Sequence, residues 1–244
     1  MHVRGRLGLL GGTFDPFHNG HLAGALAARD ALGLDCVHVI PAYVPPHRPT
    51  RPQASAEHRF AMVALGIAHT DGLIADDREL RSGEVSFTTD TLARLAAEGW
   101  ERSQLFFITG ADAFAEIATW RHYPALLDQA HFVVVSRAGR RASSLRAEMP
   151  SLADRMRDVS PGARGAGVDT AQPAIWLIDA DTPDVSATRI RQAVAEGRPI
   201  AGLTPPLVEQ HILRHGLYRP ESRPGFPAAP SSEAADALHE QEPA

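Results

Sequence analysis

The sequence predicts an α/β fold, built as a doubly wound parallel sheet with helices on both faces. Runs of apolar residues with the length of a strand recur along the 244-residue chain, and a stretch with helical periodicity follows each run. The runs are apolar throughout, which is typical of strands that are buried on both faces in a parallel sheet. Because such sheets bind ligands at the carboxyl ends of their strands, we expect the functional residues to follow the strands.

Five pairs of strand and helix are expected in chain order. The strands are the runs LGLL, VHVI, LFFIT, FVVV and IWLI, at residues 7–10, 37–40, 105–109, 132–135 and 175–178. The helices that follow them span residues 19–32, 55–68, 111–117, 145–157 and 186–196. This regular alternation predicts crossover helices between parallel strands.

Two segments lie outside this pattern. Residues 137–174 contain RAGRR and SPGARGAG, and their glycine, arginine and serine content predicts a mobile connection around one helix. The C-terminal stretch is rich in proline, alanine, serine and glutamate and has one aromatic residue, so it cannot bury enough apolar surface to order itself. We therefore expect one domain over residues 1–219 and a disordered acidic tail over residues 220–244.

The chain has no lysine, because all 24 of its basic residues are arginine. This excludes a Walker A lysine, a Schiff-base lysine for pyridoxal phosphate and lysyl-adenylate chemistry, since each needs an amine that only lysine supplies. Any phosphate group must therefore be bound by arginine, histidine, hydroxyl groups or backbone amides.

The remaining composition points to a cytoplasmic protein. A single cysteine, Cys36, excludes an internal disulfide and a cysteine-rich zinc site. The formal net charge of −5 gives no basic surplus for binding nucleic acid. The apolar run at the start is too short for a signal peptide, and no stretch approaches the roughly 18 apolar residues of a membrane span.

The residues after the first strand read GGTFDPFHNGHL, from Gly11 to Leu22. Two glycines at a strand end let another group approach the backbone closely, and the amides at the start of the following helix attract anions. His18 and His21 are three residues apart, so both rings can face the same strand-end cleft if the helix begins near Asn19. The alternatives are a histidine that caps the helix and a pair of metal ligands. The metal interpretation is weaker because no H-E-x-x-H motif or third ligand accompanies the pair.

The segment GGTFDPFHNGH resembles the GGxFDPxHxGH signature of nucleotidyltransferases that transfer an adenylyl group from ATP. The resemblance implies a Rossmann-like fold and Mg²⁺ bound with ATP. It also implies that His18 and His21 bind the triphosphate and stabilise the transition state at the α-phosphorus. The backbone amides that assist them in the family correspond here to Gly11, Gly12, Thr13 and Phe14.

Five later motifs resemble bacterial nicotinate mononucleotide adenylyltransferases and occur in that family's order. They are PAYVPPHR at residues 41–48, SFTTDTL at 86–92, ITGADAF at 108–114, VSATRIR at 185–191 and the C-terminal helix in GLTPPLVEQHILRHGLY at 202–218. The resemblance implies transfer of the adenylyl group of ATP to nicotinate mononucleotide, which yields nicotinate adenine dinucleotide (deamido-NAD) and pyrophosphate in NAD biosynthesis. Three residues depart from the family pattern: Phe87 replaces tyrosine, Ala187 replaces serine and Arg48 replaces lysine.

The motif VSATRIR supplies candidate ligands for the β- and γ-phosphates of ATP. Ser186 is a favoured type of residue for the cap of the following helix, and that structural role is the alternative to phosphate binding. Together with Thr188 and Arg189 it would offer amides, hydroxyls and a guanidinium to a polyphosphate. We count Arg189 with the two histidines as catalytic. Arg191 is either structural or a second phosphate contact.

Five side chains are candidates for binding the second substrate. Asp112 follows a strand and can accept hydrogen bonds from ribose hydroxyls, or it can cap the next helix. The resemblance implies that Trp120 stacks on the pyridine ring, whereas most tryptophans belong to a core. It also implies that Thr88 helps to hold the nicotinate carboxylate. Arg48 and Arg137 are candidate anion contacts, with solvated surface charges as the alternative.

Two other functions are compatible with the sequence. An adenylyltransferase of the same superfamily could use nicotinamide mononucleotide or phosphopantetheine as its acceptor, and a nucleotide-sensing module could keep the fold without turnover. The intact histidine, serine, threonine and arginine positions argue against the sensing module. No metal ion bound by the protein alone is expected, since His211 and His215 lack a third ligand. A homo-oligomer is also compatible with the sequence.

Overall fold

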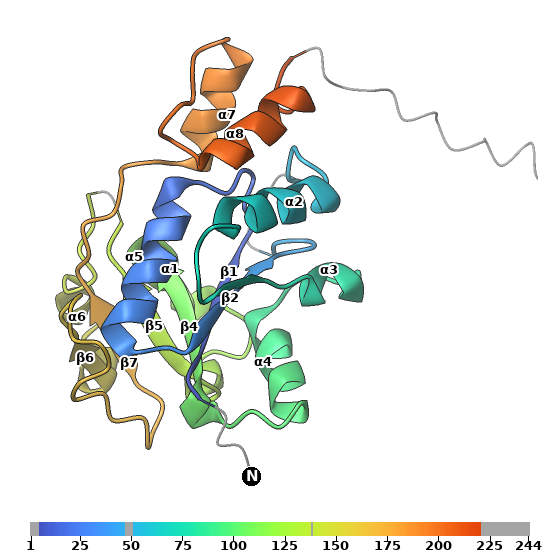
Figure 1. The fold of residues 1–244 in the computed structure, drawn as a ribbon. Coiled ribbons are helices and arrows are strands. Elements are labelled where there is room, and N and C mark those ends of the chain that lie inside the picture. Colours follow the sequence, from blue (N-terminus) through green and yellow to red (C-terminus); the bar gives the residue numbers. More distant parts are fainter. Residues whose placement is uncertain (1–4, 47–50, 138, 221–244) are drawn as a thin grey trace, which may run out of the picture.

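The computed structural model describes residues 5–46, 51–137 and 139–220 (Figure 1). These residues contain a sheet of seven parallel strands in the order β3-β2-β1-β4-β5-β7-β6. The five predicted strands are all present, which confirms the doubly wound parallel sheet. Most of the tail expected over residues 220–244 lies outside the described residues. The strands are β1 (Leu7–Gly12), β2 (Cys36–Pro41), β3 (Leu73–Ala75), β4 (Leu105–Gly110), β5 (His131–Val135), β6 (Met156–Asp158) and β7 (Ile175–Ile178).

Helices cover both faces of this sheet. One face is covered by α1 (Asn19–Leu32) and α2 (Ala56–Ile67). The helices α7 (Ala187–Ala195) and α8 (Pro206–Arg214) lie beyond the end of the sheet and extend the same core, and α8 packs against α2 (Figure 1). The other face is covered by α4 (Thr88–Ala97), α5 (Ala111–Phe114) and α6 (Leu145–Glu148). The further helical pieces are α3 (Arg78–Ser82) and the 3₁₀ turns η1 (Arg102–Gln104), η2 (Ile117–Thr119), η3 (Ala125–Asp128) and η4 (Pro150–Arg155).

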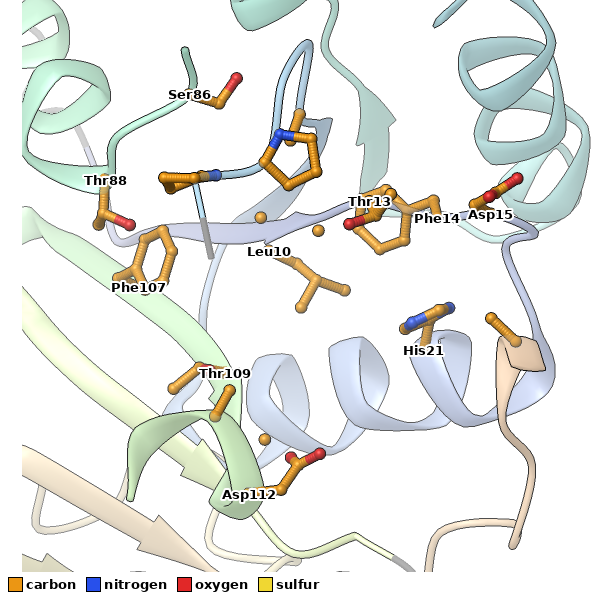
Figure 2. A pocket seen from close by; sticks show the side chains of 18 of the residues that line it. Leu10, Thr13, Phe14, Asp15, His21, Ser86, Thr88, Phe107, Thr109 and Asp112 are labelled. Carbon is orange, nitrogen blue, oxygen red and sulfur yellow. The ribbon is translucent and has the colours of Figure 1, made fainter. Parts of the chain in front are cut away.

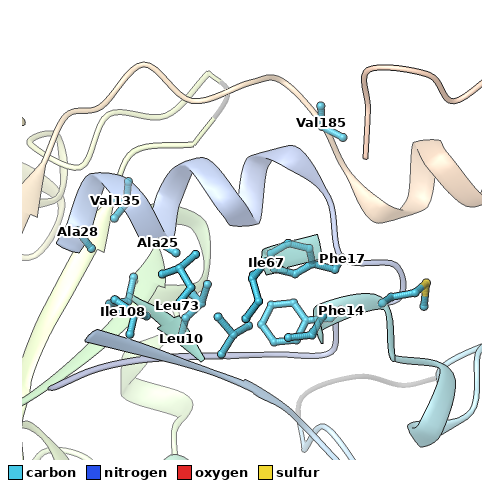
Figure 3. Packing of buried hydrophobic residues seen from close by; sticks show 14 of the residues in the cluster. Leu10, Phe14, Phe17, Ala25, Ala28, Ile67, Leu73, Ile108, Val135 and Val185 are labelled. Carbon is cyan, nitrogen blue, oxygen red and sulfur yellow. The ribbon is translucent and has the colours of Figure 1, made fainter. Parts of the chain in front are cut away.

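Side chains alternate between two cores along the central strands. On β4, Phe106 and Ile108 lie in the core beneath α1, whereas Leu105 and Phe107 lie in the core on the opposite face. Figure 3 shows Ile108 in the first core together with Ala25 of α1. Because both faces of each central strand are buried, the strands read as continuous apolar runs in the sequence.

Two helices are shorter than predicted. The helix expected over residues 111–117 ends at Phe114 and is followed by η2. The helix expected over residues 145–157 ends at Glu148, because Pro150 has no N–H to donate and disfavours helical geometry at the residue before it. The one α-helix expected within residues 137–174 is therefore present, but its predicted C-terminal bound was wrong. That segment also contains β6, which pairs with β7 and widens the sheet.

The order of strands reverses direction at β1. From β1 the chain adds β2 and β3 on one side of the sheet, and it then returns to add β4 and β5 on the other side. The carboxyl ends of β1 and β4 therefore flank a crevice, which is where open α/β sheets bind ligands. No helix in the described part of the chain is long and apolar enough to cross a membrane.

Candidate active site

A cleft of about 360 Å³ opens at the carboxyl ends of β1 and β4. This volume falls in the range of small-molecule sites. Figure 2 shows its walls, which come from the loop after β1 and from the starts of α1, α4 and α5, while the start of α7 completes the lining. Arg189 does not line the cleft, and Arg48 lies outside the described residues. The predicted site residues that line it are Gly11, Gly12, Thr13, Phe14, His18, His21, Thr88, Asp112, Trp120, Arg137, Ser186 and Thr188.

The two histidines lie at the start of α1, where His18 is the N-cap residue. Their rings stack with centroids 3.6 Å apart. His18 is 1% exposed, and neither of its ring nitrogens has a hydrogen-bond partner within the described residues. Burial, with the nearby positive charge of Arg137, lowers the pKa of His18 from 6.5 to about 3. His18 is therefore a neutral imidazole at pH 7, and its buried polar atoms can be satisfied by a ligand.

The backbone fixes the tautomer of His21. The amide N–H of His18 donates a hydrogen bond to Nδ1 of His21 over 3.2 Å. Since Nδ1 accepts this bond, a neutral His21 carries its proton on Nε2. The ring packs edge-on against Phe14, with centroids 5.0 Å apart, and stacks on Phe17 at 5.5 Å. His21 therefore brings an N–H donor of fixed orientation to the cleft (Figure 2).

The loop between β1 and α1 is packed against its own aromatic side chain. A Cβ on Gly12 would stand 2.8 Å from the ring of Phe14, so this position requires glycine. Phe14 has a left-handed backbone with φ at 50°, which is rare for a bulky residue. Its ring is buried in the core beneath α1 (Figure 3). This packing holds the main chain of the loop beside the histidines, where backbone amides can bind an anion.

The start of α7 forms another wall of the cleft. Ser186 is the N-cap residue of α7, and its Oγ accepts a hydrogen bond from the amide of Arg189 over 3.2 Å. Ser186 and Thr188 both line the cleft. The Arg189 side chain, in contrast, is 68% exposed and pairs with Asp184 over 3.3 Å. The structure therefore separates the side chain of Arg189 from the other predicted phosphate ligands.

Arg191 is the arginine of this motif that reaches the wall of the cleft. Its guanidinium donates one hydrogen bond to the backbone carbonyl of Asp15 over 2.7 Å and another to Oγ1 of Thr188 over 3.3 Å. Both partners line the cleft. Of the two roles left open for Arg191, the structure shows the structural one, and it places the charge beside the start of α7.

The other end of the cleft is aromatic. Thr88 is the first residue of α4 and lies near Phe107 (Figure 2). The indole of Trp120 stands edge-on to Phe107, with ring centroids 5.9 Å apart. Trp120 is half-buried, packs against the core on this face and also lines the cleft. Its indole therefore combines core packing with a surface that a ligand can reach.

Asp112 and Arg137 meet at the ends of β4 and β5. The guanidinium of Arg137 donates to the carboxylate of Asp112 over 3.3 Å, and both side chains line the cleft. Asp112 is the second residue of α5, whose N-cap is Gly110, so the alternative in which Asp112 caps this helix was wrong. The pair offers an acceptor for hydroxyl groups and a cation for an anionic group at one place.

A smaller hollow of about 60 Å³ adjoins the cleft beside α1. His21 and Arg137 line both spaces, and Gly24, Ser136 and Thr182 line only the hollow. A Cβ on Gly24 would meet no atom within 4 Å, so the surface of α1 is open there. This hollow was not predicted from the sequence. A glycine inside a helical pattern was the available signal.

Three buried charged residues near the cleft were also missed. Asp15, Arg59 and Glu79 are 4%, 1% and 7% exposed. Burial raises the pKa of Glu79, whose carboxyl group accepts a hydrogen bond from Oγ1 of Thr91 over 2.6 Å. In the sequence these residues are ordinary polar members of a loop or a helix, and only the tertiary structure brings them into the interior.

Comparison with known proteins assigns the family. A family model described as cytidylyltransferase-like matches residues 9–193. A relative from Chromohalobacter salexigens, named "Probable nicotinate-nucleotide adenylyltransferase", is 41% identical over 218 residues, which cover 87% of this chain and 95% of the relative. A relative of the same name from Pseudomonas syringae pv. tomato is 40% identical over 223 residues, covering 91% and 97%. The chain belongs to the nicotinate-nucleotide adenylyltransferase family.

Solved structures agree with this assignment at the level of the fold. A Plasmodium falciparum nicotinic acid mononucleotide adenylyltransferase complexed with NaAD superposes with a TM-score of 0.65 at 17% identity, covering 88% of this chain and 97% of that chain. The Rossmann-like architecture expected from the motifs is therefore confirmed. Within this nicotinate-nucleotide adenylyltransferase fold, the loop after β1 and the start of α7 fall inside the residues that the family model matches.

Proposed function

We propose that this chain transfers the adenylyl group of ATP to nicotinate mononucleotide, releasing nicotinate adenine dinucleotide and pyrophosphate. The observation that carries the proposal is the position of His18 and His21 in one cleft with the start of α7 and an aromatic end. The histidines and the helix start suit a polyphosphate, and the aromatic end suits the flat ring of a second nucleotide. Relatives named for this activity at about 40% identity support the same conclusion.

In this reaction a phosphate oxygen of the mononucleotide attacks the α-phosphorus of ATP. A new P–O bond forms, the bond from the α-phosphorus to the oxygen shared with the β-phosphorus breaks, and pyrophosphate leaves. The attacking phosphate is already ionised at neutral pH, since its second pKa is about 6, so no general base is required. The task of the protein is to align two anions and to stabilise the charge at the α-phosphorus.

His18 and His21 would donate hydrogen bonds to the α-phosphate in the transition state. His21 carries its proton on Nε2 because Nδ1 accepts the amide of His18. His18 is neutral at pH 7 and buried, so its orientation is fixed before the substrate binds. Donors that are preorganised in this way contribute about 10²–10³-fold each to turnover. The amides from Gly11 to Phe14 would complete the α-phosphate site.

The start of α7 would hold the β- and γ-phosphates that leave as pyrophosphate. The hydroxyls of Ser186 and Thr188 and the first amides of the helix are the proposed ligands. Arg191, fixed beside Thr188, adds a positive charge next to this group. Arg189 pairs with Asp184, so its guanidinium would have to leave this carboxylate to bind a phosphate oxygen. With that exchange, Arg189 remains a proposed ligand of the phosphates.

ATP is proposed to enter as its complex with Mg²⁺. Nucleotidyltransferases of this kind use a divalent metal ion with ATP. Across the described ranges, no group of three His, Cys, Asp or Glu side chains is arranged to hold a metal ion. Three carboxylates of the described residues line the cleft, and each is already engaged. Asp112 accepts from Arg137 and Glu79 accepts from Thr91. Asp15 accepts two backbone amides and the hydroxyl of Tyr218. The ion is therefore assigned to the triphosphate and water, which is the usual way in which Mg²⁺ is bound.

The acceptor is proposed to bind at the aromatic end of the cleft. Its pyridine ring would stack on Trp120, and its carboxylate would lie at the start of α4 near Thr88. Asp112 would accept a ribose hydroxyl, and Arg137 would bind the mononucleotide phosphate. Arg48 stays a candidate anion contact. The smaller hollow beside α1 would take part of the nucleoside of ATP.

The test is acceptor-dependent release of pyrophosphate. ATP and Mg²⁺ are supplied with nicotinate mononucleotide, nicotinamide mononucleotide or phosphopantetheine in separate reactions, and the products are separated by chromatography. We expect the fastest release, and a dinucleotide product, with nicotinate mononucleotide. Faster release with another acceptor would reassign the substrate, and binding of ATP without release in any reaction would favour the sensing module.

A further inference from the structure

The loop that leads to the histidines is anchored at the buried carboxylate of Asp15. Its Oδ1 accepts a hydrogen bond from the amide of Ala54 over 3.1 Å and from the hydroxyl of Tyr218 over 2.8 Å. Its Oδ2 accepts the amide of Gln53 over 2.8 Å. Two of these donors are backbone groups of the segment before α2. The third is a side chain 203 residues further along the sequence.

Tyr218 is fixed in the interior at this contact. It follows α8, is 9% exposed, and its hydroxyl lies 3.9 Å from Sδ of Met62 on α2. Its backbone is left-handed, with φ at 69°, a conformation that a bulky residue keeps only where its surroundings fix it. Burial and the adjacent Asp15 carboxylate raise the pKa of Tyr218, so the hydroxyl retains its proton and remains a donor.

Two arginines hold the main chain of the same loop. Arg191 donates to the carbonyl of Asp15 over 2.7 Å. Arg59 is 1% exposed and donates to the carbonyl of Thr13 over 2.9 Å and to two carbonyls that follow β2. These bonds fix backbone carbonyls but do not engage the carboxylate of Asp15. Among the described donors to that carboxylate, two are backbone amides and the hydroxyl of Tyr218 comes from a side chain.

We propose that Tyr218 is a positioning residue for adenylyl transfer, acting through Asp15 on the loop that carries His18. The kinetic part of this inference rests on the proposed function. Asp15 and His18 lie between the end of β1 and the start of α1, outside regular secondary structure, so the path of the loop depends on these tertiary contacts. Tyr218 follows α8 and lies outside residues 9–193, which the family model matches. It would therefore contribute to the site although it is far from the site motifs in the sequence.

The variant Tyr218→Phe removes the hydroxyl and keeps the ring. We expect kcat to fall about 10-fold, because a hydrogen bond to an ionised group is lost. The KM values for ATP and nicotinate mononucleotide should change less than about threefold, since the groups that would touch substrate stay in place. Asp15→Asn should cause a loss at least as large, because its NH2 group would face one or two of the three donors that the carboxylate accepts. The effects of the two changes should be less than additive in the double variant, because Asp15 and Tyr218 share one contact.

Met62→Leu is the matched control. It alters the packing around the hydroxyl of Tyr218 but leaves the bond to Asp15, and Met-to-Leu exchanges are well tolerated in cores, so kcat should stay within about twofold of wild type. If the role of Tyr218 were merely structural, Tyr218→Phe and Asp15→Asn would lower the Tm and leave kcat unchanged. That result would overturn the proposal.

Hydrogen exchange tests the same proposal without the reaction. In Tyr218→Phe the amides of residues 13–22 should exchange faster, while those of β1 and β4 keep their wild-type rates, because local opening depends on the contacts that hold each segment. Unchanged exchange in residues 13–22 would overturn the proposal. If the wild-type protein released no pyrophosphate with any acceptor, the proposed function would fail separately, and the exchange comparison would still decide the role of Tyr218.

Discussion

His18 and His21 would both donate hydrogen bonds to a polyanion. A different set of contacts prepares each ring for this role. His18 is kept neutral by burial and by the charge of Arg137, which lower its pKa to about 3. His21 is oriented by the amide bond to its Nδ1 and by its packing on Phe14 and Phe17. Contacts within the protein set both arrangements, so little reorganisation is needed when ATP binds.

His21→Ala is expected to lower kcat by about 10²–10³-fold, because it removes one preorganised donor at the α-phosphate. The Tm should stay near that of wild type, since the ring is only half-buried. Steady-state pyrophosphate release and thermal unfolding of one preparation check both statements. His69→Ala, at an exposed position outside the cleft, is the control and should turn over normally. Near-normal turnover of His21→Ala would remove the histidine from the mechanism.

Trp120→Ala is expected to raise KM for nicotinate mononucleotide much more than KM for ATP. Stacking of an aromatic side chain on a base contributes about 1–3 kcal/mol, so the increase should be on the order of 10-fold or more. The two KM values, measured by varying each substrate with the other saturating, serve as internal controls for each other. Equal increases for both substrates would assign Trp120 to the core alone.

Roles of single residues could be predicted where residue type and spacing decide the geometry. The three-residue spacing brought the rings of His18 and His21 together, and the N-cap at Ser186 follows from its place before a helix. The preference for Arg189 over Arg191 as the phosphate ligand had no such basis. Two residues separated by two positions differ by about 200° around a helix, and nothing in the sequence decides which faces the cleft.

At the scale of elements, the sequence predicts strands better than short helices. The central strands are buried on both faces, so their residue types are strongly constrained. The three-residue β3 was missed because so short a run has no periodicity. The helix α4 was missed because it opens with threonine and aspartate, which have low helix propensity, and Leu92 and Leu95 secure it by packing on the sheet.

Gly24 tests the assignment of the smaller hollow to the nucleoside of ATP. Gly24→Ala fills open space in the middle of α1 and should raise the free energy of unfolding by about 0.5–1 kcal/mol, since glycine is unfavourable inside a helix. Gly24→Phe should fill the hollow and raise KM for ATP without a matching rise for nicotinate mononucleotide. Urea unfolding and substrate titration provide the measurements. If Gly24→Phe left KM for ATP unchanged, the nucleoside would have to bind elsewhere.

On the scale of the whole molecule, two buried neutral histidines make the fold sensitive to acid. His18 and His131 are 1% and 0% exposed. Nδ1 of His131 accepts the amide of Ala174 over 3.1 Å and the indole N–H of Trp176 over 3.2 Å, so protonation there would break both contacts. Burial is the main cause that lowers the pKa of His131 to about 4.

The free energy of unfolding is therefore expected to fall as the pH drops from about 6.5 towards about 4. In this window the unfolded chain binds protons at both histidines while the folded chain does not, and the loss is up to about 1.4 kcal/mol per pH unit for each group. Urea unfolding at neutral and mildly acidic pH measures it. In His131→Gln one titrating group is absent, so the slope should be smaller. Equal free energies of unfolding at both pH values would contradict the neutral buried state.

The architecture and the edge of the sheet that carries the cleft could both be predicted, because the alternation of strands and helices fixes a parallel sheet and its ligand-binding end. The hydrogen bond between Tyr218 and Asp15 could not be predicted. It joins residues from opposite ends of the chain, and no local pattern marks either of them as a partner. Contacts of this kind depend on how α8 docks on α2.

The most direct measurement follows a radioactive label at the α-phosphorus of ATP. Labelled ATP and Mg²⁺ are incubated with the protein and nicotinate mononucleotide, and the products are separated. If the cleft carries out adenylyl transfer, the label appears in nicotinate adenine dinucleotide and is absent from pyrophosphate, and His21→Ala slows its appearance by about 10²–10³-fold. Label that stays in ATP, or that appears in AMP instead of the dinucleotide, would contradict adenylyl transfer to this acceptor.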